Sequence, residues 1–201
     1  MSQPHESKAP ARIALAEPRG LFQRAIFWFV AREFGRTPRS MRVGARWPRL
    51  FRATIWMELA LEAGSSIPVR TKKLADLAAA RTIGCRYCMD IGSWVALNSG
   101  VKASDLAAFD DYERAPCFSE SERAAIALSE AMSATPPEVD EALFARVRAH
   151  FSEAQIVELA SVVAWEQYRA RLNHTLGLAP DGFLDTDSCP MPQPAVSPIS
   201  A

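Results

Sequence analysis

An alanine-rich stretch over residues 71–83 constrains the fold of this chain more than any other segment. It includes Ala75 and three consecutive alanines at 78–80, and it contains neither proline nor glycine before Gly84. Alanine is the best helix former, whereas glycine is common just after the last helical turn. The sequence therefore predicts a helix over 71–83 that stops at Gly84.

Apolar residues recur at helical spacing through most of the rest of the chain. Pro48 suits a first helical turn, Ser104 and Ser152 suit N-caps, and residues 119–122 form a capping box. Further helices are expected over 20–34, 48–62, 88–98, 105–112, 123–132, 138–151 and 153–176. Since no segment alternates like a strand, the predicted class is all-α with about eight helices.

The ends of the chain differ in composition from its middle. Residues 1–17 show no sustained period, so a flexible N-terminus is expected there. Residues 18–178 carry the helical pattern and are predicted to form a single domain. Residues 179–201 are rich in proline and poor in apolar residues, which predicts an extended or disordered tail.

Charge and hydropathy exclude several classes of protein. The 23 basic residues balance 23 acidic ones, which argues against a nucleic-acid partner. Residues 1–52 hold Lys8 and ten arginines against three glutamates, but these alternate with apolar residues as on an amphipathic packing segment. No run is long enough for a membrane span, and no stretch has the plan of a signal peptide. A cytoplasmic location is therefore expected.

Two of the four cysteines, Cys85 and Cys88, are separated by two residues. Residues i and i+3 share a helix face, so the two sulfurs can form a disulfide in a first helical turn. Unpaired backbone N–H groups at that position stabilise a thiolate, which is the species that reacts with peroxides and disulfides. The pair therefore predicts thiol redox chemistry.

Two other uses of this spacing compete with redox chemistry. Structural zinc usually needs a second pair of ligands, but Cys117 and Cys189 are isolated and the three histidines are scattered. No metal and no bound organic cofactor are therefore expected. The cysteines can also pack merely as small apolar residues.

Residues 78–92, which contain the cysteine pair, resemble the signature helix of the carboxymuconolactone decarboxylase-like and alkyl hydroperoxidase D-like family. The segment from Gly100 through 118–125 and the closing segment 165–174 are similar to later parts of the same family. The resemblance covers about residues 35–178. It implies an all-helical antioxidant-defence fold that assembles into homo-oligomers such as trimers or hexamers.

The resemblance also implies roles for the two cysteines. In the redox members of this family the second cysteine attacks the peroxide and the first resolves it as a disulfide. Cys88 would then be peroxidatic and Cys85 resolving. The lactone decarboxylases of the superfamily generally do not use a cysteine pair, so the pair argues against that activity.

Two relay positions depart from the family pattern. The redox members carry a histidine four residues after the second cysteine and a glutamate twelve residues before the first, where this chain has Gly92 and Lys73. Asp90 lies on another helix face and would raise a nearby thiol's pKa. A cation such as Lys73 or Arg86 would lower that pKa without transferring a proton.

Several other residues are candidates for supporting roles. Glu166, Arg169 and Asn173 share one face of the last predicted helix, either as a packing network or as a polar wall beside the cysteines, with Glu166 as a substitute base. His174 suits a helix C-terminus or a catalytic role. Tyr87 either packs or directs its hydroxyl at the thiolate.

The sequence favours a thiol-dependent peroxidase or disulfide oxidoreductase that acts on a small hydroperoxide or disulfide and is regenerated by a thiol reductant. One alternative is a non-catalytic oligomeric or redox-sensing protein on the same scaffold, which the missing relay supports. Another is a decarboxylase- or isomerase-type enzyme in which the cysteines are incidental. The Trp and Phe residues of segment 21–56 are expected to cover a partner subunit in a dimer, trimer or hexamer.

Overall fold

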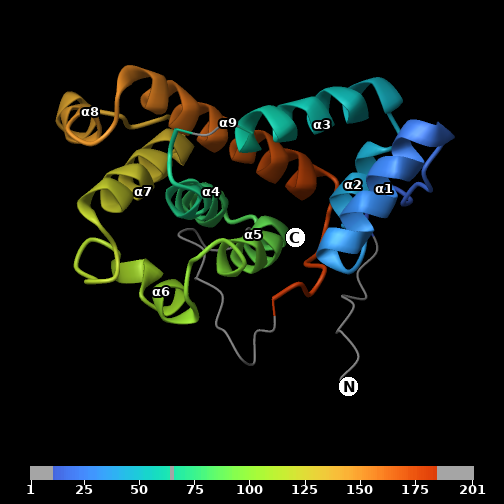
Figure 1. Cartoon of the computed structure of the whole chain (residues 1–201), viewed down its shortest axis with the longest axis horizontal. Coiled ribbons are helices and arrows are strands. Elements are labelled where there is room, and N and C mark those ends of the chain that lie inside the picture. Colours follow the sequence, from blue (N-terminus) through green and yellow to red (C-terminus); the bar gives the residue numbers. More distant parts are fainter. Residues whose placement is uncertain (1–10, 64–65, 185–201) are drawn as a thin grey trace.

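The structure is a computed structural model that describes residues 11–63 and 66–184 (Figure 1). Within these residues the chain is entirely helical and has no strand, as the sequence predicts. The elements are α1 (Gly20–Phe34), α2 (Arg39–Gly44), α3 (Pro48–Glu62), α4 (Val69–Ile83), α5 (Arg86–Leu97), α6 (Ala103–Ala107), η1 (Phe109–Asp111, a 3-10 turn), α7 (Glu120–Ser133), α8 (Glu141–Arg148) and α9 (Glu153–Thr175).

Helix α4 is the centre of the domain and packs against α5, α7 and α9 (Figure 1). Its alanines at 75 and 78–80 are fully or almost fully buried. Side chains this small let neighbouring helices approach closely on several sides, so the composition that makes 71–83 a helix also makes it central.

Most helix ends follow the predicted signals. Gly84 ends α4 with a φ of 78°, and the next residue's N–H bonds the Ala80 carbonyl at 2.9 Å. The capping box at Ser119 and the Ser152 N-cap are both present. The predicted Ser104 cap is wrong: α6 begins at Ala103, and the Lys102 N–H is bound instead by the Asp105 carboxylate at 2.9 Å.

Two helices besides α6 differ from the sequence-based expectation. α2 is an additional short helix, whose six residues are too few to show a periodic pattern. α8 is shorter than the predicted 138–151, because Asp140 caps it by accepting the Leu143 N–H at 2.8 Å.

Parts of both predicted flexible ends pack on the helical body. Arg12 donates its backbone N–H to Leu176 at 2.9 Å, and Ala16 donates to Arg42 at 3.1 Å. At the other end, Leu184 is buried in the same apolar cluster as the cysteines. The described residues 11–17 and 179–184 therefore belong to the domain, while the rest of both predicted ends lies outside the described residues.

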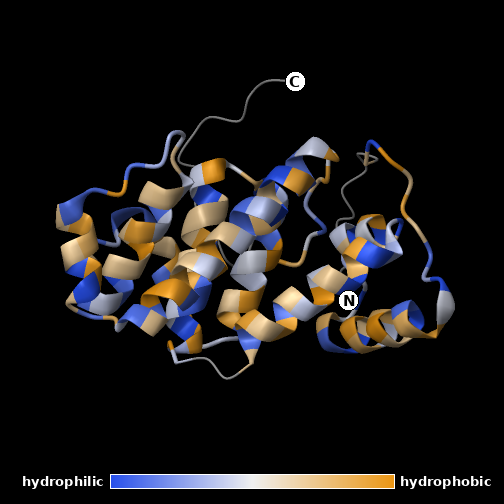
Figure 2. Cartoon of the chain, turned by 90° about the horizontal axis from the view of Figure 1, so that it is seen from above, coloured by the Kyte–Doolittle hydropathy of each residue, from blue (hydrophilic) through white to orange (hydrophobic). Residues whose placement is uncertain are grey.

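Helices α1, α2 and α3 form an outlying part of the molecule (Figure 1) with a small apolar core of its own. Figure 2 shows that apolar residues occur on helices throughout the molecule. Three tryptophans of this part, Trp28, Trp47 and Trp56, are each more than 60% exposed. No helix within the described ranges is long and apolar enough to cross a membrane.

Candidate active site

The cysteine pair lies at the junction of α4 and α5, where the chain turns at Gly84. Cys85 is the N-cap of α5, Cys88 lies in its first turn, and the two form a disulfide. The Cys88 N–H donates to the Cys85 Sγ at 3.2 Å. The expected placement of both residues at a helix start is confirmed.

The surroundings of the disulfide are almost entirely apolar. Cys85 is 4% exposed and Cys88 is 5% exposed, and they share a core cluster with Leu77, Met89 and Ala170. One polar side chain from α9 reaches this cluster: the Asn173 Nδ2 donates to the Cys88 Sγ at 3.5 Å. Of the three residues that the sequence offered as a polar wall beside the cysteines, Asn173 contacts a sulfur, whereas Glu166 and Arg169 pair with each other.

Tyr87 contacts other groups than the sulfurs. Its hydroxyl lies 3.0 Å from the Ser40 Oγ and 3.0 Å from the Asp181 Oδ2, and it accepts the Ser40 N–H at 3.1 Å. Burial, reinforced by the negative Asp181, raises the pKa of this hydroxyl above its usual range. Tyr87 therefore joins α5 to α2 and to the C-terminal segment as a neutral phenol.

Asp90 also faces the C-terminal segment. Its buried carboxylate accepts the N–H groups of Gly182, Phe183 and Leu184 at 2.8, 3.2 and 2.8 Å. These three bonds satisfy the carboxylate where water does not reach it. Asp90 therefore anchors the backbone of the C-terminal segment.

The two positions that depart from the relay pattern have different surroundings. Lys73 forms an ion pair with Glu62 of α3. Gly92 lies in α5, and a Cβ added there would meet only the Leu77 Cδ1, at 3.9 Å. Arg86 and His174, two further candidates, are exposed.

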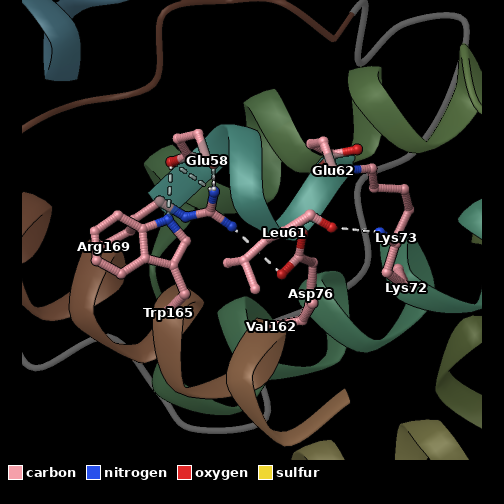
Figure 3. A pocket seen from close by; sticks show the side chains of 9 residues that line it. All are labelled: Glu58, Leu61, Glu62, Lys72, Lys73, Asp76, Val162, Trp165 and Arg169. Atoms are coloured by element: carbon pink, nitrogen blue, oxygen red, sulfur yellow. Dashed lines mark hydrogen bonds and ion pairs between the residues drawn. The ribbon is translucent and has the colours of Figure 1, made fainter. Parts of the chain in front are cut away.

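A cluster of carboxylates lies around Arg169, in a cleft between α3, α4 and α9 (Figure 3). The Arg169 guanidinium pairs with Glu58 at 3.0 Å, Asp76 at 3.3 Å and Glu166 at 2.7 Å. Trp165 adds a bond from its Nε1 to Glu58 at 2.9 Å. Three carboxylates therefore share one guanidinium, with the Lys73–Glu62 pair at the cleft's edge.

Glu166 is the most deeply buried carboxylate of this cluster. Burial raises its pKa to about 7, although Arg169 acts in the opposite direction, and its Oε1 has no hydrogen-bond partner among the residues that the structure describes. Burial also raises the pKa of Asp76. Sequence reasoning missed Asp76, although an aspartate inside the alanine-rich stretch was a visible signal. The predicted grouping of Glu166 with Arg169 is present as an ion pair.

The predicted site residues therefore separate into three groups. Cys85, Cys88 and Asn173 meet at the start of α5, and Tyr87 and Asp90 hold the C-terminal segment. Lys73 lines the carboxylate cleft, and Glu166 pairs with Arg169, which also lines it. Among the residues that the structure describes, no three His, Cys, Asp or Glu side chains are arranged to hold a metal ion. The arrangement at α5 can change between a dithiol and a disulfide.

Comparison with known sequences relates this chain to one family. The model of the Carboxymuconolactone decarboxylase family matches residues 45–131, which include α4, α5 and most of α7. The Escherichia coli (strain K12) protein YnjA is 29% identical over 160 residues, which cover 78% of this chain and 86% of YnjA.

Two solved structures show the same fold. The alkylhydroperoxidase AhpD core, a peroxidase-related protein from Ralstonia eutropha JMP134, superposes with a TM-score of 0.77 at 20% identity, covering 88% of this chain and 96% of that one. The debrominase Bmp8, in complex with 2,3,4-tribromopyrrole, gives a TM-score of 0.77 at 21% identity and covers 87% and 95% of the two chains. The resemblance carried by the signature helix is therefore confirmed: residues 45–131 match the carboxymuconolactone decarboxylase family model, and the chain has the AhpD-like helical fold.

Proposed function

We propose that this protein is a thiol-dependent hydroperoxide reductase that uses Cys88 and Cys85. The observation that carries the proposal is the Cys85–Cys88 disulfide at the N-terminus of α5, on a fold shared with a peroxidase-related AhpD core. A disulfide there is the expected end product of such a reaction. The N–H groups of a helix start stabilise a thiolate in this pair, which is the species with which the reaction begins.

The reaction begins with attack of the Cys88 thiolate on the terminal oxygen of the hydroperoxide. The O–O bond breaks, Cys88 becomes a sulfenic acid, and the alkoxide that leaves takes the proton of the Cys85 thiol. The Cys85 thiolate then attacks the Cys88 sulfur. An S–S bond forms, hydroxide leaves, and a proton from solvent converts it to water.

The two thiols thus supply the two electrons that reduce one hydroperoxide to an alcohol and water. An external dithiol must return the disulfide to the reduced state by thiol–disulfide exchange. A reducing compartment suits this step, so the proposal includes a cytoplasmic location.

The proton steps in this scheme do not need the relay glutamate and histidine, whose positions are occupied by Lys73 and Gly92 in this chain. Cys85 can serve as the proton donor, because the disulfide places its sulfur next to that of Cys88. General-base assistance typically contributes about 10²–10⁴-fold, so turnover slower than in relatives that keep the relay is expected.

A redox-sensing role without turnover is the second candidate. The burial of both sulfurs favours it, since a substrate must reach a disulfide that is at most 5% exposed. Such a protein would form the disulfide on oxidation but would not be recycled efficiently by a small dithiol.

The proposal also includes assembly into a homo-oligomer. Leu21, Trp28 and Phe29 of α1, together with Trp56 and Leu59 of α3, are all more than half exposed. An apolar surface of this kind is typical of an interface. Helices α1 and α3 are therefore the proposed contact with a second copy.

The test of the proposed activity is turnover of an organic hydroperoxide by the purified protein with dithiothreitol as reductant. Sustained alcohol formation that Cys88→Ser abolishes and Cys117→Ser leaves unchanged supports the proposal, since Cys117 is an exposed free thiol. One oxidation per chain without recycling supports the sensor instead. Because the fold is shared with a debrominase, a bromopyrrole is tested as an alternative substrate in the same assay.

A further inference from the structure

The two sulfurs of the pair have different hydrogen-bond donors. The Cys85 Sγ accepts from the backbone N–H of Cys88 at 3.2 Å, and the Cys88 Sγ accepts from the Asn173 side-chain amide at 3.5 Å. We propose that Asn173 is the positioning residue that makes Cys88, rather than Cys85, the attacking thiolate. This inference deepens the proposed function and rests on it.

The helix start alone favours the other sulfur. Cys85 is the N-cap, and its side chain takes the place that an N-cap oxygen usually occupies. The backbone N–H that it accepts is an orphan donor of the first turn, which stabilises negative charge on Cys85. Without another donor, Cys85 would therefore hold the thiolate more readily than Cys88.

Asn173 supplies that other donor. Its side chain is only 6% exposed, so its bond to a sulfur anion is little weakened by water. Its backbone is also fixed, because the Asn173 carbonyl accepts the Leu178 N–H at 3.0 Å where α9 gives way to the C-terminal segment. A hydrogen bond to a charged partner is stronger than one to a neutral partner, so this bond gains strength when Cys88 ionises.

The charged and titratable groups on the neighbouring elements are engaged elsewhere or exposed. On α5, Asp90 and Tyr87 bind the C-terminal segment, and Arg86 is exposed. On α4, Arg81 pairs with Asp110 and Glu130.

On α9, Arg169 pairs with Glu166, and His174 is exposed. In the C-terminal segment, Asp181 pairs with Arg39. Within the described residues, Asn173 is thus the side chain whose polar atom reaches the Cys88 sulfur.

The experiment measures which sulfur reacts first in the fully reduced protein. A limiting amount of iodoacetamide is added between pH 5 and 10, and tryptic cleavage after Arg86 places the two cysteines in different peptides. The native chain is expected to label Cys88 first and at lower pH. Asn173→Leu, which keeps the branched shape but removes the donor, should lower the Cys88-to-Cys85 labelling ratio by about tenfold or more.

Asn173→Asp provides a second arm if the leucine variant does not fold. An aspartate against the sulfur replaces a donor by a negative charge, so Cys88 should ionise at higher pH and lose its preference. Asn98→Leu is the matched control, because Asn98 is an exposed asparagine whose side-chain amide bonds the Trp94 carbonyl of its own helix. It should leave the ratio unchanged.

Preferential labelling of Cys85 in the native chain, or an unchanged ratio in folded Asn173→Leu and Asn173→Asp, would overturn the inference. The readout contains no peroxide. A ratio that changes in a protein without hydroperoxide turnover therefore supports the role of Asn173 while it contradicts the proposed function.

Discussion

The Asp90 carboxylate binds the backbone of Leu184, with its Oδ1 2.8 Å from the Leu184 nitrogen across 94 positions of sequence. Its Oδ2 accepts the N–H groups of the two preceding residues. The Phe183 ring of the same segment contacts Phe34 edge-on and Trp94 at a tilted angle. One buried acid on the cysteine helix thus fixes the C-terminal segment on the domain.

The first prediction is that Asp90→Ala destabilises the fold. The substitution leaves three backbone N–H groups near a buried position without their acceptor, which should cost roughly 2–4 kcal/mol in the free energy of unfolding. Urea denaturation followed by circular dichroism measures this cost. The exposed Asp111→Ala should change stability by less than about 0.5 kcal/mol, and an equal effect of the two substitutions would contradict the anchoring role.

The second prediction concerns pH and Glu166. Its pKa in the folded chain is about 7, above the ordinary value of 4.5, because of burial. The folded state therefore binds more protons than the unfolded state between these values, so the contribution of Glu166 to stability is complete below about pH 4.5 and is lost as pH rises through 7.

Glu166→Gln removes this titration. The free energy of unfolding of the native chain, minus that of Glu166→Gln, should therefore fall by at most about 3 kcal/mol from pH 5 to pH 8. Thermal or urea unfolding of both chains over that range gives the difference. A difference that is constant with pH, or that rises with it, would show that Glu166 is ionised throughout.

The fold could be predicted well from sequence because its signals are local. The alanine-rich stretch, Gly84 and the capping box at Ser119 each act within a few residues, and all three are present in the structure. The Ser104 cap was wrong because Asp105, the neighbouring residue, took the Lys102 N–H and also pairs with Arg70 from a distant helix. Tertiary contacts of that kind leave no local pattern.

The site could be predicted in part for the same reason. Cys85 and Cys88 are close in sequence, so their spacing alone places them in one helical turn. Asn173 and Asp181 meet the cysteine helix from 85 and 94 positions away, and only the packed structure brings them there. The sequence grouped Glu166 with Asn173 by helix face, but two helical turns separate them, and they bind different partners.

A third prediction is that Gly92→His speeds hydroperoxide reduction. The position has room for a side chain, since an added Cβ would meet only Leu77 at 3.9 Å. A base there should raise the rate of Cys88 oxidation by up to about 10²–10⁴-fold, measured by stopped-flow under single-turnover conditions.

Gly92→Ala is the control for this change. It should stabilise α5 by about 0.5–1 kcal/mol without altering the oxidation rate. An alanine variant as fast as the histidine variant would attribute the gain to helix stability. The relay glutamate is not restored at position 73 in the same variant, because Lys73→Glu would place another carboxylate beside Glu62 and Asp76.

A fourth prediction concerns assembly. Light scattering at micromolar concentration should give a multiple of the 22.1 kDa chain mass. Trp56→Glu, at a side chain that is 66% exposed, should shift this mass toward one chain because it places a charge in the proposed interface. Val157→Glu, at an exposed apolar position on α9, is the matched control. A single-chain mass for the native protein would refute the proposal.

The central claim, that Cys88 attacks a hydroperoxide and Cys85 resolves it, is tested most directly by limiting peroxide on the reduced single variants, read by intact mass. Cys85→Ser should gain one oxygen at Cys88, Cys88→Ser should leave Cys85 largely unoxidised, and the native chain should lose two hydrogens as its disulfide forms. If Cys85 is oxidised as readily without Cys88, the order of attack is wrong. If neither cysteine reacts faster with peroxide than a free thiol does, the protein is not a peroxidase.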